Sequence, residues 1–492
     1  MRILVTGASG YVGGRVVPRL VEAGHDVRVI VRNPGRLGGA PWRDDVEIVE
    51  GDLRSARDVR AAVEGMDALY YLVHSMGSGG DFETTERRIA EVVASAAKDA
   101  GLSRIVYLGG LHPDTTELSP HLRSRAEVGT ILLSSGVPTV VLQAGTVIGS
   151  GSASFEMIRH LTEVLPVMPA PKWVRNFIQP IAVRDVLHYL VAAVELPAEV
   201  NRTFDIGGPD VLRYGQMMNG YAVEAGLKQR AIISLPVLTP WLASQWVNMV
   251  TPIPRSLAVP IIASLQYDCV MSEHDIDDVI PRPEGGLTSY RRAVRLALGK
   301  VRNLDIETSW KNATVDGAPS DPIPSDPDWA GRTVFTDLRT KHSSASSPAV
   351  WKVIESIGGD NGWYSLPFAW EARGLLDKIA GGVGLRRGRR HPTQLLEGEA
   401  LDFWRVEEIE RGSLLRLRAE MRVPGKAWLE MSVEDDPQGG SQYRQRAVFF
   451  PKGLGGRLYW WVILPFHGII FPGMASRIIR AAESDKETLA PK

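Results

Sequence analysis

Apolar and amphipathic segments alternate along the first part of the chain. The apolar runs, which predict strands, cover residues 2–6, 26–31, 46–49, 68–73, 104–108 and 139–143. Segments with helical periodicity separate these runs, and one of them covers about residues 82–100. Apolar strands that alternate with helices are typical of a parallel sheet covered on both faces. The pattern therefore predicts an α/β fold with a doubly wound parallel sheet.

The pattern changes in the last third of the chain. Residues 414–421 and 427–433 alternate apolar and polar positions around Pro424-Gly425, which predicts a hairpin with one solvated face. Strand-like sequence follows at 443–450, and an apolar, then amphipathic, helix is expected around residues 459–482. This part is predicted to be an α+β domain with an antiparallel sheet and a long carboxy-terminal helix.

A proline- and serine-rich stretch separates the two patterns. Residues 319–327 contain four prolines, and a serine-rich run covers residues 343–348. Such stretches are typical of connections between domains. The chain of 492 residues is long enough for two to four domains, at about 100–200 residues each. We predict a first domain over residues 1–300, a connection over 301–348 and a second domain over 349–492.

Composition and charge exclude several classes of protein. The net charge of −1 argues against a nucleic-acid-binding scaffold, and 44% hydrophobic with 23% charged residues is ordinary for a soluble globular protein. The single cysteine, Cys269, excludes an intrachain disulfide, a zinc ribbon and an iron–sulfur cluster. No metal site is predicted. The sequence does not indicate an oligomeric state.

Two segments bear on the cellular location of the protein. The first apolar run is too short for a signal-peptide core and is interpreted as a buried strand, so a cytoplasmic protein is expected. Residues Leu458 to Met474 form the one membrane-like stretch, but Pro465 and Pro472 interrupt it and its length is near the lower limit for a span. A buried helix or a segment that docks on a membrane surface is preferred to a span.

A glycine-rich turn between the first strand and the first helix carries the strongest functional signal. Gly7 permits a tight turn, Gly10 lets the backbone approach a pyrophosphate, and Gly13 lets the helix pack close to the strand. Many glycine turns bind nothing, but the strand before and the helix after favour a Rossmann dinucleotide site. The expected cofactor-binding residues of this turn are Gly7, Ser9, Gly10, Tyr11, Val12 and Gly13.

The ends of the next two strands indicate which dinucleotide binds. Arg32 ends the second strand, Arg36 is close behind, and no carboxylate stands at the tip, which favours NADP(H) over NAD(H). The alternative is a solvated surface arginine. After the third strand, Asp52 and Leu53 are expected beside the adenine, although Asp52 could equally cap the following helix.

These motifs resemble the short-chain dehydrogenase/reductase superfamily, specifically its extended and atypical branches, which include NmrA-like proteins. The resemblance covers about residues 1–300 and includes residues 71–75, 179–186 and 204–209. It implies a nicotinamide cofactor whose ribose is bordered by Leu72, Val73 and His74.

The catalytic positions depart from that superfamily. Its enzymes usually carry a serine after the fifth strand and a Tyr-x-x-x-Lys pair on the next helix. Here residues 107–111 contain no serine, and the helix aligns His121 with the tyrosine and Arg125 with the lysine. A histidine can donate a proton near neutral pH, and an arginine can hold the cofactor ribose. Alternatively, His121 caps the helix or lies on its surface.

A glycine–serine loop follows the sixth strand, on the side of the sheet where ligands of open α/β folds bind. Its hydroxyl groups and backbone amides could orient a substrate, although such runs are more often plain loops. The candidate substrate residues are Gly149, Ser150, Ser152, Phe155 and Glu156.

The region from Trp351 onward resembles a bacterial domain family of unknown function, and its strands and long helix resemble a helix-grip (START or Bet v 1-like) domain. The helix-grip resemblance implies a cavity for an apolar ligand, which aromatic side chains could line, or they could simply fill the core. Arginines within residues 386–390 could bind an anionic headgroup or form a solvated hairpin tip. The aromatic residues concerned are Trp404, Trp428, Tyr459, Trp460 and Trp461.

Three functions follow from these features. The first is an NADP(H)-dependent oxidoreductase that acts on a small apolar carbonyl, enone or quinone without the usual dyad. The second is a nonenzymatic NADP(H)-responsive binding protein of the NmrA-like kind. The third is an apolar-ligand carrier in peripheral contact with a membrane, and none of the three involves nucleic acid.

Overall fold

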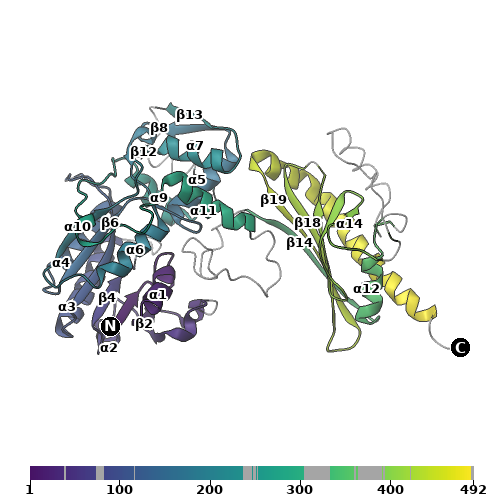
Figure 1. Ribbon diagram of the computed structural model, residues 1–492, viewed down its shortest axis with the longest axis horizontal. Helices are drawn as coiled ribbons and strands as arrows, with labels where there is room; N and C mark the ends of the chain where they lie inside the picture. The colour runs from purple at the N-terminus through teal and green to yellow at the C-terminus, as the bar shows by residue number, and fades with distance from the viewer. Residues whose placement is uncertain are drawn as a thin grey trace. The chain divides into compact units, whose positions relative to one another are not determined.

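The computed structural model divides into two compact units, Met1–Gly331 and Arg332–Lys492 (Figure 1). It describes residues 1–37, 40–73, 82–115, 117–235, 253–303, 333–358, 394–421 and 423–488, together with 247, 251, 362, 363 and 391. Most of the predicted connection over 301–348 lies outside these ranges.

A seven-stranded parallel sheet forms the centre of the amino-terminal unit. Its strand order is β11-β6-β5-β4-β1-β2-β3, and all neighbouring strands are parallel. The order reverses between β1 and β4, and this confirms the predicted doubly wound sheet. The strands are β1 (Arg2–Thr6), β2 (Asp26–Val31), β3 (Glu47–Glu50), β4 (Ala68–Tyr71), β5 (Arg104–Gly110), β6 (Thr139–Ala144) and β11 (Arg202–Ile206).

Helices cover both faces of this sheet. Ile3 and Val5 of β1 join the core on one face, and Leu4 joins the core on the other, all three fully buried. This two-sided burial explains why the strands are continuous apolar runs in the sequence. One face carries α1 (Gly13–Glu22) and α6 (Val183–Ala193), and the other carries α2 (Ala56–Val63), α3 (Phe82–Asp99) and α4 (Pro120–Leu133).

A further core follows β6 in the same unit, with Phe155 and Tyr221 fully buried in it. Its short strands pair as β7 (Val147–Ile148) with β10 (Ile181–Ala182), β8 (Val167–Pro171) with β13 (Ala231–Leu235), and β9 (Phe177–Ile178) with β12 (Leu212–Arg213). The helices of this region are α5 (Ala153–Val164), α7 (Tyr214–Glu224), α9 (Arg255–Ser264), α10 (Ile276–Val279) and α11 (Tyr290–Asn303).

The carboxy-terminal unit is an antiparallel sheet with a long helix, as predicted. Its six strands have the order β14-β19-β18-β17-β16-β15, and the predicted hairpin is the pair β17–β18. The elements are β14 (Phe335–Ser343), α12 (Ser347–Glu355), β15 (Ala400–Leu401), β16 (Trp404–Glu410), β17 (Leu414–Ala419), β18 (Gly425–Asp435), β19 (Ser441–Pro451) and α14 (Gly453–Thr488).

The sheet begins earlier in the chain than the sequence predicted. β14 pairs with β19 from Phe335↔Phe449 to Ser343↔Ser441, inside the segment assigned to the connection. Its residues are mostly polar, because it is an edge strand, and two of its buried side chains are Asp337 and Ser343. Apolar alternation therefore gave no signal for this strand.

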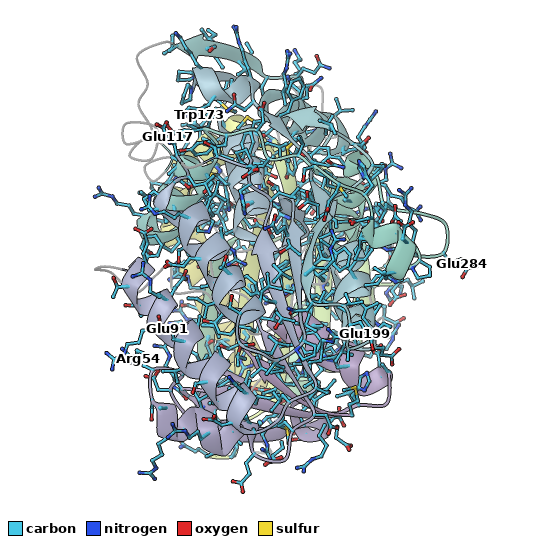
Figure 2. The ribbon with its side chains drawn as sticks, turned by 90° about the vertical axis from the view of Figure 1, so that its left-hand side faces the viewer. Arg54, Glu91, Glu117, Trp173, Glu199 and Glu284 are labelled. Atoms are coloured by element: carbon cyan, nitrogen blue, oxygen red, sulfur yellow. The ribbon has the colours of Figure 1, made fainter. Side chains whose placement is uncertain are left out.

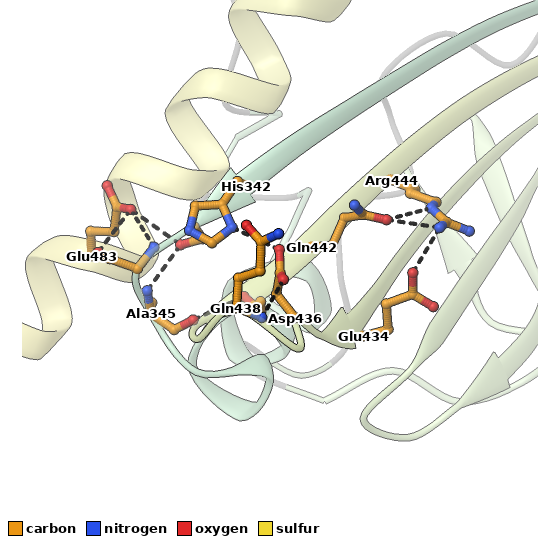
Figure 3. Close-up of polar contacts among 11 residues, drawn as sticks. His342, Ala345, Glu434, Asp436, Gln438, Gln442, Arg444 and Glu483 are labelled. Carbon is orange, nitrogen blue, oxygen red and sulfur yellow. Dashed lines mark hydrogen bonds and ion pairs between the residues drawn. The ribbon is translucent and has the colours of Figure 1, made fainter.

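One end of α14 is held to β14 by Glu483. The Glu483 carboxylate accepts hydrogen bonds from the Ser344 N–H at 2.9 Å and the Ser344 hydroxyl at 3.1 Å. The bond from the Ser344 N–H is the main cause that lowers the pKa of Glu483. Nearby, His342 Nδ1 lies 3.0 Å from Asp436 Oδ2 (Figure 3).

Among the described helices, α14 alone is long and apolar enough to cross a membrane, judged by length and composition. The stretch concerned is Gly453–Ser484, with a mean hydropathy of 1.5.

Candidate functional site

Three glycines shape the turn between β1 and α1. Gly7 has φ +77°, a conformation that favours glycine, and a Cβ there would lie 2.6 Å from the Leu72 carbonyl oxygen. The Gly10 N–H donates to the Gly7 carbonyl at 2.9 Å and closes the turn. A Cβ on Gly13 would lie 2.1 Å from the same Gly7 oxygen. Backbone contacts therefore require glycine at positions 7 and 13.

The amino terminus of α1 is suited to an anion. The helix has no side-chain cap and no acidic residue in its first turn, so its first N–H groups and its dipole favour negative charge. The turn lies where the strand order reverses, the usual ligand position in an open α/β sheet. Ser9, Tyr11 and Val12 are all partly exposed in it. The glycine cradle thus fits the pyrophosphate of a dinucleotide.

Two exposed arginines follow β2. Arg32 comes directly after the strand, and Arg36 lies in a 3-10 helix, Pro34–Leu37. Beyond β3, Asp52 Oδ2 lies 2.6 Å from Arg54 Nη2, and Arg54 projects from the surface (Figure 2). The hydrogen bond from Arg54 lowers the pKa of Asp52, and the charge of Arg32 adds to this effect. Arg32 and Asp52 are therefore close enough to interact electrostatically.

The two residues after Gly51 have separate environments. Leu53 is buried in the core under α2 and α3. The alternative that Asp52 caps α2 is wrong, because the cap is Ser55, whose side chain accepts from the Asp58 N–H.

Leu72 and Val73 follow β4 directly and are partly exposed. The Leu72 N–H donates to Thr6 Oγ1 at 3.2 Å, and the same hydroxyl donates to the Tyr70 carbonyl at 2.9 Å. These bonds place Leu72 beside the glycine turn. His74, the third residue predicted here, lies outside the described residues.

His121 and Arg125 lie one turn apart on α4, and each contacts a different neighbour. His121 Nδ1 lies 2.8 Å from the hydroxyl of Ser264, the last residue of α9. Arg125 donates to the Leu108 carbonyl, and its guanidinium carbon lies 5.5 Å from the centre of the Tyr107 ring. Both side chains are partly buried.

The alternative that His121 caps α4 is wrong. The cap is Ser119, whose hydroxyl accepts from the Leu122 N–H at 3.3 Å. A cavity of about 140 Å³ lies beside Arg125 and is also lined by His112. His112 Nε2 lies 3.1 Å from Gln143 Nε2 at the end of β6. Sequence reasoning missed His112, although its place just after the fifth strand was a signal.

The predicted substrate loop lies against the glycine turn. A Cβ on Gly149 would lie 2.2 Å from the Tyr11 hydroxyl oxygen. Arg15 connects the two segments, because its guanidinium donates to the Tyr11 carbonyl at 3.0 Å and the Ser150 carbonyl at 3.4 Å. A predicted cofactor residue and two predicted substrate residues are thus brought together.

The other three candidates are buried, and Phe155 and Glu156 lie in the first turn of α5 rather than in the loop. Glu156 accepts from the Gly151 N–H at 2.9 Å, and its second oxygen lies 3.3 Å from Arg159 Nη1. The Ser152 hydroxyl donates to a backbone carbonyl, and the Phe155 ring packs edge-on against a tyrosine. Contact of any of them with a substrate stays a prediction.

Sequence reasoning also missed Arg15 and Trp42, which support the turn. The Trp42 indole N–H donates to the Gly14 carbonyl at 2.9 Å from a buried position. Neither residue belongs to a motif, so only the tertiary structure reveals these contacts.

The described residues hold no group of three His, Cys, Asp or Glu side chains suited to a metal ion. Burial raises the pKa of the Cys269 thiol to about 12, which keeps it protonated at neutral pH.

In the carboxy-terminal unit, the aromatic candidates differ in exposure. Trp404, Trp428 and Trp460 are buried, Tyr459 is partly buried, and Trp461 is 62% exposed. The Trp404 ring lies 6.1 Å from that of Trp363 inside the core. The arginine run 386–390 lies outside the described residues.

Two family models match the chain, one in each unit. Residues 7–145 match a family described as NAD(P)H-binding, and residues 329–474 match a protein of unknown function, DUF2867.

Among curated proteins, the chain is 34% identical over 116 residues to a 3-beta-hydroxysteroid dehydrogenase of Mycolicibacterium neoaurum. The match covers 22% of this chain and 31% of that enzyme, so the chain spans about a third of its length. The chain is also 28% identical over 217 residues to a (4-alkanoyl-5-oxo-2,5-dihydrofuran-3-yl)methyl phosphate reductase of Streptomyces griseus, with 43% of this chain and 69% of that enzyme covered.

Among solved structures, the triphenylmethane reductase of Citrobacter sp. shares the fold, with a TM-score of 0.50 and 18% identity. The match covers 61% of this chain and 100% of that one. Together with the geometry of the glycine turn, these findings show that the amino-terminal unit has a Rossmann-like, NAD(P)-binding fold that is similar to the fold of oxidoreductases.

Proposed function

We propose that the protein is an NADP(H)-dependent oxidoreductase that reduces a small apolar carbonyl, enone or quinone. The observation that carries this proposal is the glycine cradle at the reversal of strand order, with Arg32 at the end of the next strand. The two curated relatives support the reaction class, since one is a dehydrogenase and the other a reductase.

Arg32 is proposed to select the phosphorylated dinucleotide. It lies at the end of β2, where a carboxylate would hold a ribose hydroxyl and an arginine accommodates a 2′-phosphate. Arg36 adds a second positive charge on the same loop. Asp52 is proposed to accept from the adenine amino group. Bound NADPH would supply a hydride to the substrate.

His121 is proposed to donate the proton that the reduced oxygen needs. Its Nδ1 contacts the Ser264 hydroxyl, which in turn donates to the Pro260 carbonyl at 2.9 Å. This chain of contacts fixes the ring orientation. Arg125 is held to the end of β5 through Leu108 and would bind the cofactor ribose, since a guanidinium does not act as a base at neutral pH.

Oxidation of NADPH in the presence of apolar carbonyls, enones and quinones tests this proposal. We expect turnover by the wild-type chain and a loss of about 100-fold or more in His121→Ala, the range of general acid catalysis. Arg123→Ala is the matched control on α4, because Arg123 is exposed and pairs with Glu83 rather than with a residue of the proposed site. Turnover that is unchanged in His121→Ala would contradict the assignment.

A nonenzymatic NADP(H)-responsive binding protein is the second candidate. It is favoured by the contacts of His121 and Arg125, which both bind groups of the protein itself. This candidate predicts NADPH binding without turnover of any substrate in the panel. The response to the cofactor would then be measured as a change in the thermal stability of the carboxy-terminal unit on addition of NADPH.

We also propose that the carboxy-terminal unit is a helix-grip domain that presents the apolar substrate. Its antiparallel sheet and long final helix support this proposal. A fluorescent fatty acid, displaced by an active substrate, is the probe for such a cavity.

A further inference from the structure

The first half of α14 presents a broad apolar surface to solvent. Trp461, Val462 and Ile469 are 62%, 68% and 66% exposed. The exposed positions recur at intervals of three and four residues, which places most of them on one side of the helix. We name this surface the outer face of α14, and it consists of Leu454, Leu458, Trp461, Val462, Leu464, Phe466 and Ile469.

The opposite side of the same helix is fixed to the sheet. The Trp460 ring stacks on Phe335 at 5.1 Å and on Phe449 at 5.9 Å between ring centres. Farther along, Met474 and Ile478 are fully buried in the core of the unit. The outer face is therefore an exposed side of a docked helix, and large exposed apolar patches mark interaction sites.

The part of α14 that carries the outer face has only basic charged residues, and the first acidic residue of the helix is Glu483. From Lys452 to Ala482 the sequence contains no Asp or Glu, but it contains Arg457, Arg477 and Arg480. Lys452 and the adjacent Lys426 are exposed near the end at which the outer face begins. Basic residues beside an apolar helical face, with an exposed tryptophan, suit an anionic lipid surface.

We propose that the outer face of α14 docks in the plane of an anionic phospholipid bilayer. A transmembrane orientation would remove Trp460 from its aromatic partners and separate His467 from Asp337, whose side chains lie 3.8 Å apart. A second copy of the chain on this face would not require anionic lipid, which separates that occupant from a bilayer. The proposal is independent of the reaction assigned to the amino-terminal unit.

Co-sedimentation of the full chain with vesicles tests the proposal. The vesicles contain phosphatidylcholine alone or an equal mixture with phosphatidylglycerol, at low and high salt. We expect binding to the mixed vesicles that weakens in high salt. The double variant Val462→Glu/Ile469→Glu is expected to bind about tenfold or more weakly, since it removes apolar area and adds repelling charge.

Val211→Glu is the matched control, because Val211 is 50% exposed in the amino-terminal unit. We expect this control to bind vesicles as the wild-type chain does. We also expect the double variant to keep its NADPH affinity, so that failure of this proposal can be told from failure of the proposed function. The proposal is overturned if the wild-type chain stays in the supernatant with mixed vesicles, or if the double variant still pellets equally. It is also overturned if light scattering shows a dimer that the double variant dissociates.

Discussion

The glycine turn after β1 and the helix α4 after β5 both follow the carboxyl end of a strand in one sheet, yet they are built differently. The turn is defined by backbone atoms: a side chain at Gly7 or Gly13 would collide with a carbonyl group. At α4, His121 and Arg125 are oriented by contacts of their side chains. A binding site built from backbone atoms can be predicted from the spacing of glycines. A site built from side chains cannot be predicted until the residues that contact those side chains are known.

Of the substitutions considered for these two regions, Gly13→Ala is expected to have the largest effect on cofactor binding. The new Cβ would lie 2.1 Å from the Gly7 carbonyl oxygen, so the turn between β1 and α1 must shift. Restoring the turn around a bound pyrophosphate would cost about 1–3 kcal/mol, the cost of overpacking, so we expect about 10- to 100-fold weaker binding of NADPH and NADH alike. Isothermal titration measures both, with Arg123→Ala as the control. Unchanged affinity would show that the turn is not the cofactor site.

Arg32→Glu is expected to change selectivity rather than binding as such. A hydrogen bond to a charged group contributes about 1.5–3 kcal/mol, so NADPH should bind about 10- to 100-fold more weakly while NADH affinity is preserved. Val211→Glu is a control, because it adds a carboxylate at an exposed position of the same unit outside the proposed cofactor site. An equal loss for both dinucleotides would refute the assignment of Arg32 to the 2′-phosphate.

Ser264→Ala tests whether the position of the His121 ring matters. Loss of one hydrogen bond of about 0.5–1.5 kcal/mol predicts about 2- to 10-fold lower kcat with KM unchanged. In His121→Ala the same change should have no further effect, since Ser264 acts through the ring. If Ser264→Ala lowers kcat equally in the wild-type chain and in His121→Ala, Ser264 does not act through the His121 ring and has only a structural role.

Asp52→Asn is expected to have the smallest effect. The Arg54 bond lowers the pKa of Asp52 in the folded chain, so ionised Asp52 stabilises the fold above its unfolded pKa near 3.8. This contribution is lost as the pH falls through the lower folded value. Thermal melts should show a difference of about 2 °C or less at pH 7, which disappears in acid. A difference that persists at low pH would point to a packing effect instead.

The sheet was predictable because its strands are buried on both faces. Residues 2–6 and 26–31 were predicted as strands and match β1 and β2. By contrast, β14 was assigned to a connection, because it is a polar edge strand whose partner lies far along the chain.

The candidate site was predictable to a smaller extent. Glycine spacing identified the turn, but the support from Arg15 and Trp42 depends on contacts between segments distant in sequence. Glu156 was proposed as a loop carboxylate that could face a ligand, and the structure buries it against Arg159. The sequence analysis placed Glu156 in the loop, whereas it lies in the first turn of α5, on the side of the helix that faces the core.

Titration of the wild-type chain with NADPH and with NADH measures the proposed cofactor selectivity. We expect NADPH to bind at one site per chain, about tenfold or more tightly than NADH, since Arg32 adds a charged contact to the 2′-phosphate. Equal affinity for the two dinucleotides, or no binding of either, would contradict this expectation.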